Sequence, residues 1–185
     1  IEIPASVTSI GRHAFHDCDS PAAVPVAEGC VARSGSNGFE SCSKLTKTQY
    51  GNCTYIKAND NPYFLLYSCD NKNFSTYQIH TDTKVIGESV FAGCERLSAI
   101  EIPASVTGIG SYAFQGCTSL ASIEIPASVT SIDDYAFYGC TSLTSVIFAE
   151  GNQLTSIGTG ARYKGTERAA EGSSGRAPSH GKSAF

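Results

Sequence analysis

The sequence predicts an α/β repeat solenoid, with a parallel β-sheet on one face of the stacked coils and short helical or 3₁₀ segments on the other. Two near-identical stretches, IEIPASVTGIGSYAFQGCTSLAS from Ile100 and IEIPASVTSIDDYAFYGCTSLTS from Ile123, set a period of 23 residues. A further copy opens at Ile1, a looser one starts at Tyr77 and a partial one at Val146. One such repeat cannot bury its apolar face alone, so repetition at this spacing indicates stacked coils.

The first element of each repeat is a predicted strand. Ile100 and Ile102 flank Glu101, so two apolar side chains point one way and a carboxylate points the other way. This alternation is typical of a half-buried strand. Pro103 then withholds a backbone donor and ends the strand.

The second half of each repeat is predicted to be a short helical or 3₁₀ segment. After a flexible corner at Gly110, apolar residues Ala113, Phe114, Cys117 and Leu120 follow at offsets of one, three and three. Such spacing places them on one side of a tight helical turn, which would face the core.

The pattern I-x-I-P-x-S-V-T-x-I-G-x-x-A-F-x-x-C-x-x-L resembles the BspA-like leucine-rich repeats, which occur in bacterial and protist surface proteins. Its 23-residue coil also falls within the range of about 20 to 29 residues typical of leucine-rich repeats. The resemblance covers about residues 1 to 18 and 39 to 158, and the stretch from Asn61 to Gly87 is similar to a segment that recurs between blocks of these repeats. It implies adhesion or protein recognition at a cell surface, and hence an extracellular or cell-surface location.

The predicted solenoid spans residues 1–158 and contains two irregular stretches. Residues 19–38 form a degenerate coil, because Pro25 falls in mid-strand and Arg33 and Ser34 stand where a buried Ile is expected. Residues 46–76 hold two predicted strands, Cys53 to Lys57 and Tyr63 to Ser68, which form an inserted hairpin. Residues 159–185 are rich in Gly, Ser and Ala and are expected to be a disordered tail.

The eight cysteines are interpreted mainly as packing residues. Five of them occupy one repeat position, which predicts a ladder of buried free thiols: Cys18, Cys42, Cys94, Cys117 and Cys140. Cys30, Cys53 and Cys69 lie outside that position, and a bridge between Cys53 and Cys69 across the hairpin remains open.

No metal, cofactor or catalytic site is predicted. The sequence has no C-x-x-C pair, and His13, His16 and Cys18 occupy ordinary positions of the repeat. No Cys/His or Ser/His pair stands out as a catalytic constellation. The sequence therefore predicts a protein that is not an enzyme.

The predicted function is a binding module that recognises a protein or a surface glycan through the outward positions of the sheet: Glu2, Gln78, Glu101 and Glu124. The alternative is a structural spacer or stalk, in which stacking alone matters. A spacer should carry uniform residues at these positions and a binding module varied ones. Glu dominates here, but Gln78, Ile147 and Pro25 interrupt it, so both interpretations stay open.

Charge and hydropathy narrow the range of partners. Residues 1–158 carry 8 basic and 15 acidic residues, a balance that does not attract phosphate backbones and argues against nucleic acid. No apolar run approaches the length needed to cross a membrane, so direct insertion is not predicted. The triplets Asn52-Cys53-Thr54 and Asn73-Phe74-Ser75 match the N-glycosylation acceptor pattern, and whether they are used stays open.

The ends of the chain suggest a piece of a longer protein that self-associates when isolated. The chain opens at Ile1 inside a patterned segment, and the layer of Val146, Phe148, Leu154 and Ile157 lacks a closing Phe-x-x-Cys segment. Solenoids shield their terminal layers with polar caps. Without such caps we expect association through the exposed apolar ends.

Overall fold

The computed structural model describes residues 9–10, 33–34, 45–58 and 60–161. In this part of the chain every regular element is a strand, and no helix occurs. The strands are β1 Ser9–Ile10, β2 Arg33–Ser34, β3 Lys47–Tyr50, β4 Cys53–Ala58, β5 Asn61–Cys69, β6 Val85–Ile86, β7 Gly108–Ile109, β8 Ser122–Ile125, β9 Ser131–Ile132, β10 Ser145–Phe148 and β11 Ser156–Ile157.

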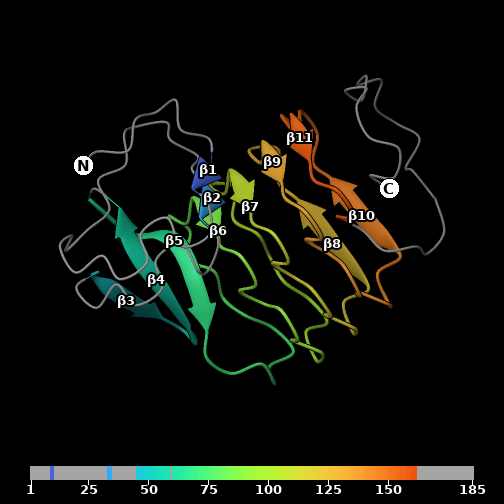
Figure 1. Ribbon diagram of the computed structural model, residues 1–185, viewed down its shortest axis with the longest axis horizontal. Coiled ribbons are helices and arrows are strands. Elements are labelled where there is room, and N and C mark those ends of the chain that lie inside the picture. Colours follow the sequence, from blue (N-terminus) through green and yellow to red (C-terminus); the bar gives the residue numbers. More distant parts are fainter. Residues whose placement is uncertain (1–8, 11–32, 35–44, 59, 162–185) are drawn as a thin grey trace.

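The largest sheet joins the hairpin region to the repeats in the order β11-β9-β7-β6-β5-β4-β3. Strands β3, β4 and β5 pair antiparallel, and the pairs from β5 to β11 are parallel. Figure 1 shows the antiparallel strands at one end and the short parallel strands following along the solenoid. The inserted segment therefore extends the sheet of the solenoid, since Leu65 and Leu66 of β5 pair with Val85 and Ile86 of β6.

The last two coils each contribute strands to two sheets, β8 and β9 from the copy at Ile123 and β10 and β11 from the copy at Val146, where the sequence predicted one strand per coil. The two preceding coils contribute one strand each, β6 and β7, and the strand predicted at Ile100–Ile102 is absent. The predicted Ile-Glu-Ile strand is present as β8, which pairs in parallel with β10 in a separate two-stranded sheet. The second strand is the dipeptide that ends in Ile109 or Ile132, six residues after the proline of its repeat. Two residues are too few to show the alternation by which a strand is recognised in a sequence.

The prediction of helical or 3₁₀ segments is wrong for the described coils. Between Gly110 and Cys117, alternate amides bond in different directions. The N–H groups of Tyr112, Phe114 and Gly116 donate to carbonyls of the next coil, and those of Gln115 and Cys117 donate within the turn. A helix needs successive N–H groups to bond within their own segment. The stacking of coils takes every second donor, so only isolated turns remain.

The apolar positions predicted to face inward do so. Phe91, Phe114 and Phe137 are buried and stack on one another, with ring centroids 5.1 and 5.3 Å apart. Leu97, Leu120 and Leu143 are buried below them in the same coils. One continuous core therefore runs through the repeats and reaches Tyr55 and Leu66 of the hairpin region.

The free-thiol interpretation is confirmed for the in-register cysteines that the structure describes. Cys94, Cys117 and Cys140 are buried and unbridged. The Cys117 thiol donates to the Phe91 carbonyl at 3.2 Å, and the Cys140 thiol to the Phe114 carbonyl at 3.0 Å. Each thiol thus packs as a small apolar group and also links two coils. Cys18 and Cys42 lie outside the described residues.

The open question of the Cys53–Cys69 bridge is answered by the hairpin. Cys53 of β4 and Cys69 of β5 are directly paired in the strand register and form a disulfide. Both predicted strands are present, with bounds one to two residues wider than expected, and β3 adds a third strand that the sequence analysis missed.

Most of the predicted degenerate coil and most of the predicted tail lie outside the described residues. In the degenerate coil of residues 19–38, the structure describes the backbone pairing of Arg33–Ser34 with Ser9–Ile10 in parallel register. The rest of that coil lies outside the described residues, as do residues 162–185 of the predicted tail.

Candidate binding surfaces

The outward strand positions proposed from the sequence are exposed wherever the structure describes them. Glu124 is exposed between Ile123 and Ile125, which are buried. Gln78 and Glu101 are also exposed, and Glu2 lies outside the described residues. The alternation of side chains along a strand thus separates this surface from the core.

Strand register brings Glu124 beside a residue of different chemistry. In the parallel pair β8–β10, Glu124 is the partner of Ile147, whose side chain is 50% exposed. Neighbouring strands lie about 4.8 Å apart, so the carboxylate and the sec-butyl side chain share one patch. We call the exposed positions Gln78, Glu101, Glu124 and Ile147 the outward row.

Gln78 and Glu101 occupy the same positions in the two preceding coils. The Ser98 amide donates to the Ser75 carbonyl at 3.0 Å, three residues before Glu101 and Gln78 respectively. The backbone bond places these two coils side by side just before the outward row. The row therefore crosses successive coils, although strand pairing is present only at Glu124 and Ile147 among the described residues.

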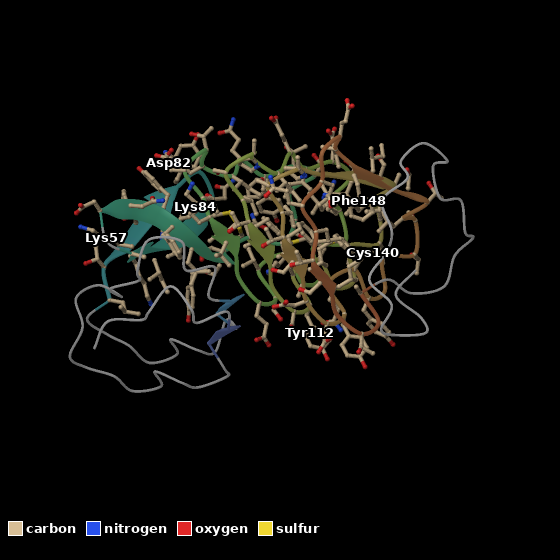
Figure 2. All side chains as sticks on the ribbon, turned by 90° about the horizontal axis from the view of Figure 1, so that it is seen from above. Lys57, Asp82, Lys84, Tyr112, Cys140 and Phe148 are labelled. Atoms are coloured by element: carbon tan, nitrogen blue, oxygen red, sulfur yellow. A yellow bond between two sulfur atoms is a disulfide. The ribbon has the colours of Figure 1, made fainter. Side chains whose placement is uncertain are left out.

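Charge divides the described part of the chain into two halves. Residues 97–161 contain no Lys, Arg or His, and they carry five carboxylates at Glu101, Glu124, Asp133, Asp134 and Glu150. Among the described residues, the lysines and Arg96 all precede this stretch; Figure 2 shows Lys57 and Lys84 at the hairpin end of the molecule. The field over the repeats is consequently negative and favours cationic partners.

A second surface, which the sequence analysis treated as ordinary variable positions, carries stacked tyrosines. Tyr112 and Tyr135 stand at equivalent positions after β7 and β9, with ring centroids 5.2 Å apart and ring planes 10° from parallel. Tyr138 meets Tyr135 edge to face at 5.8 Å and is 42% exposed. We call Tyr112, Tyr135 and Tyr138 the tyrosine surface. Figure 2 shows Tyr112 at an outer margin of the solenoid.

The backbone at these tyrosines is left-handed. Tyr112 and Tyr135 both have φ of 56°, as does Ser89 one coil earlier, and Gly160 occupies the same position one coil later with φ of 60°. For residues with a side chain this conformation costs of order 1–3 kcal/mol. In an alignment of the repeats, Gly160 shares a column with Tyr112 and Tyr135. A glycine in that column is a weak indication of the left-handed backbone.

Burial raises the pKa of most titratable groups in the core of the described region; the exception is Cys140, whose pKa is lowered by the hydrogen bond with Cys117. Burial raises the pKa of the Cys94 thiol, and the hydrogen bond with Cys140 together with burial raises the pKa of the Cys117 thiol. Burial also raises the pKa of Tyr77, whose hydroxyl lies 3.5 Å from the Cys94 sulfur. These groups hold their protons and are closed to solvent, which makes them poor nucleophiles.

Metal ligation and membrane crossing find no support among the residues that the structure describes. No three His, Cys, Asp or Glu side chains gather there as a metal site, and His13, His16 and Cys18 lie outside this part. No described helix is long and apolar enough to span a bilayer. Asn52 and Asn73 of the two glycosylation triplets are both exposed, and their use stays open.

The chain belongs to the BspA type leucine rich repeat family, whose pattern matches residues 1–61 and 63–167 in six copies. Leucine-rich-repeat proteins generally act as non-catalytic interaction modules, since their stacked coils present extended binding surfaces. No curated protein matches the chain.

Solved bacterial structures share its architecture. The pneumococcal vaccine antigen PcpA is 22% identical with a TM-score of 0.54, over 85% of this chain and 34% of that one. A leucine-rich repeat protein from Eubacterium ventriosum is 23% identical with a TM-score of 0.52, over 86% of this chain and 41% of that one. The Treponema pallidum leucine rich repeat protein is 26% identical with a TM-score of 0.42 and covers 86% and 60%. This chain thus spans 34–60% of the length of these three proteins.

Proposed function

We propose that this chain is a non-catalytic interaction module whose outward row binds a partner protein of net positive charge. One observation carries the proposal: Glu124 and Ile147 lie side by side on β8 and β10 and are both exposed, between the buried Ile123 and Ile125 on β8 and between half-buried residues on β10. A partner would bury the apolar side chain of Ile147, which is 50% exposed, and its positive charge would be recognised by the neighbouring Glu124 carboxylate.

The charge of the partner follows from the stretch that holds Glu101, Glu124 and Ile147, three of the four positions of the outward row. The stretch from residue 97 to 161 carries five carboxylates and no basic residue. Electrostatic complementarity would speed the encounter with a basic surface and select against acidic ones. A glycan without positive charge would gain nothing from this field, and for that reason we favour a protein.

The same proposal includes an exported or cell-surface location. The Cys53–Cys69 disulfide supports it, because structural disulfides persist in oxidising compartments and are rare in the cytosol. Membership of a family found in surface proteins also supports it.

A structural spacer is the second candidate, and one observation favours it. The hydroxyl groups of Thr107, Thr130 and Thr155 each donate to the carbonyl of the preceding coil, at Lys84, Thr107 and Thr130 respectively. This ladder serves coil stacking alone. It would be equally useful in a stalk that binds nothing.

A charge-reversal pair separates the two candidates. Surface proteins of the source cell would be captured on the parent chain, on Glu101→Lys/Glu124→Lys, and on Glu95→Lys/Asp70→Lys as a matched control outside the outward row. We expect a basic protein that is lost from the first variant and kept by the second. Purification of that protein and titration calorimetry would then give its affinity.

Three other outcomes would contradict the proposal. Equal binding to all three proteins would remove the outward row from the interface. Retention of a neutral glycan in place of a protein would make the chain a lectin. Capture of nothing by any of the three would favour the spacer.

A further inference from the structure

A second row of side chains runs beside the outward row on the same face of the solenoid. Its members stand two residues after Gln78, Glu101 and Glu124, and in each coil one buried residue separates the two positions. Side chains two residues apart on an extended backbone point to the same face. The members of this second row are all partly exposed: His80, Pro103 and Pro126.

Stacked rings continue this row into the hairpin region. The Tyr63 ring of β5 lies on the His80 imidazole, with centroids 3.5 Å apart and planes 14° from parallel. The Asp82 amide donates to Nδ1 of His80 at 3.1 Å, which fixes the plane of the imidazole. Tyr50 of β3 meets His80 edge to face at 4.8 Å and is 37% exposed, so it flanks the hairpin end of the row. We call these four positions the ring row: Tyr63, His80, Pro103 and Pro126.

Rings and carboxylates therefore lie side by side along several coils. The ring row offers uncharged or weakly polar ring faces, and Glu101 and Glu124 stand next to it in the outward row. Lys84, the lysine nearest to His80 in the chain, comes after the buried Thr83. It belongs to the column of Thr107, whose hydroxyl donates to the Lys84 carbonyl and which leads into the second sheet. A ligand that lies along both rows thus meets rings at the hairpin end and carboxylates further on.

The spacing of the coils favours one conformation of the ligand. Paired strands lie about 4.8 Å apart, so two coils advance by about 9.6 Å along the solenoid. A polyproline II helix advances by about 9.3 Å per turn of three residues, which brings every third residue to the surface in step with every second coil. An α-helix, at about 5.4 Å per turn, falls out of step by about 1.2 Å over the same two coils. An extended strand repeats after about 6.7 Å and matches neither one coil nor two.

We propose that the partner binds through a proline-rich segment in the polyproline II conformation, which runs along the ring row and carries an arginine or lysine for the outward row. Polyproline II segments dock on aromatic-lined surfaces, and their preformed helix lowers the entropy cost of binding. A proline in contact with Tyr50 and His80 places the residue three positions later two coils on, beside Glu124. The expected pattern in the partner is therefore Pro-x-x-Arg or Pro-x-x-Lys. This inference rests on the proposed function and names the chemistry of its partner.

The probe is a short capped peptide with the pattern Pro-x-x-Pro-x-x-Arg, in which x is Ala or Pro, studied by titration calorimetry on the full chain. One control peptide moves the arginine by one residue, which turns it by about 120° away from the surface. A second control replaces every proline by glycine, which keeps the charge and removes the preformed helix. Among the variants, Tyr50→Ala removes the flanking ring and Tyr50→Phe keeps it. Phe74→Ala is the matched control, because Phe74 is 36% exposed and lies outside both rows.

We expect Tyr50→Ala to bind the proline peptide about fivefold more weakly than the parent, and Tyr50→Phe and Phe74→Ala to bind it within about twofold. The shifted peptide and the glycine peptide should each bind the parent at least about fivefold more weakly than the proline peptide. Glu124→Gln should weaken binding of the proline peptide about threefold, the usual scale for an exposed ion pair. Circular dichroism spectra of all variants should match the parent, which separates a lost contact from a lost fold.

The peptides separate failure of this inference from failure of the proposed function. Equal binding of the glycine or the shifted peptide would overturn the polyproline II geometry and leave a basic partner in place. Equal binding by the parent and Tyr50→Ala, or an equal loss in Phe74→Ala, would remove the ring row from the site. Absence of binding by every peptide, beside capture of a basic protein by the outward row, would overturn this inference alone. Unchanged binding of the proline peptide by Glu101→Lys/Glu124→Lys would contradict the proposed function as well.

Discussion

Two columns of aromatic rings run through the same coils, one inside the solenoid and one at its surface. Phe114 and Phe137 have centroids 5.3 Å apart and planes 10° from parallel, and Tyr112 and Tyr135 have centroids 5.2 Å apart and planes 10° from parallel. The geometry is the same because coil stacking imposes it on any ring at a repeated position. Burial is different: the Phe column is fully enclosed, and the Tyr column is only partly buried on a left-handed backbone.

The comparison teaches that stacking distance alone does not reveal what a ring contributes. A buried ring stabilises the fold through the apolar area removed from water. A partly buried ring removes less apolar area from water, and the strained backbone offsets part of that gain, so its net contribution to stability should be smaller. Four measurements would break or sharpen this distinction.

The largest effect is expected at the interior column. Phe114→Ala should lower the free energy of unfolding by about 3 to 5 kcal/mol, because it empties a fully buried site between two other rings. Chemical denaturation of parent and variant gives the difference. A loss below about 1 kcal/mol would show that the column is not internal.

Alkaline pH should weaken the interior next. Burial raises the folded pKa of Cys94, and the hydrogen bond with Cys140 raises that of Cys117, so these two thiols keep their protons above the pH at which the unfolded chain releases them. The same hydrogen bond lowers the pKa of Cys140, which offsets part of the effect. Their contribution is fully present below about pH 8 and decreases as pH rises, by about 1.4 kcal/mol per pH unit and thiol at most.

Urea denaturation between neutral and alkaline pH, under anaerobic conditions that keep the thiols reduced, measures this slope. The double variant Cys94→Ala/Cys117→Ala is the control and should show a shallower decline. An identical slope in both proteins would mean that other groups cause the loss.

Removal of one interior thiol should have a smaller effect. Cys117→Ala deletes one sulfur from the core and one weak donor to the Phe91 carbonyl, so we expect a loss of about 1 kcal/mol in the free energy of unfolding. The Phe91 carbonyl also accepts a hydrogen bond from the Cys94 amide, so it keeps one partner when the Cys117 thiol is removed. A loss as large as that of Phe114→Ala would indicate that the thiol ladder organises the coils.

The smallest effect is expected at the surface column. Tyr112→Gly relieves a left-handed conformation that costs a residue with a side chain about 1–2 kcal/mol, and it loses a ring stack worth about 0.5–1.5 kcal/mol. The free energy of unfolding should therefore change by less than about 1 kcal/mol. Denaturation curves for this variant beside Phe114→Ala provide the check. A loss of several kcal/mol would make the tyrosine a structural residue.

The two surfaces also differ in how far the sequence could locate them. The outward row was found from alternation, since Glu101 and Glu124 each stand between two isoleucines. The tyrosine surface has no such signal in the sequence, because the side chains at the positions of Tyr112, Gln115 and Tyr138 vary from coil to coil. Only the φ angles and the ring contacts distinguish these positions.

The sequence by itself determined the 23-residue period, the inward apolar positions, the buried thiols and two strands of the inserted hairpin. All of these follow from local patterns of apolar and turn residues repeated along the chain. The tertiary structure decided that the turns after Gly110 are not helical, that the last two coils contribute strands to two sheets, and that Cys53 pairs with Cys69. The physical reason is common to all three: they depend on backbone groups and side chains in other coils or strands, which meet only when the chain is stacked.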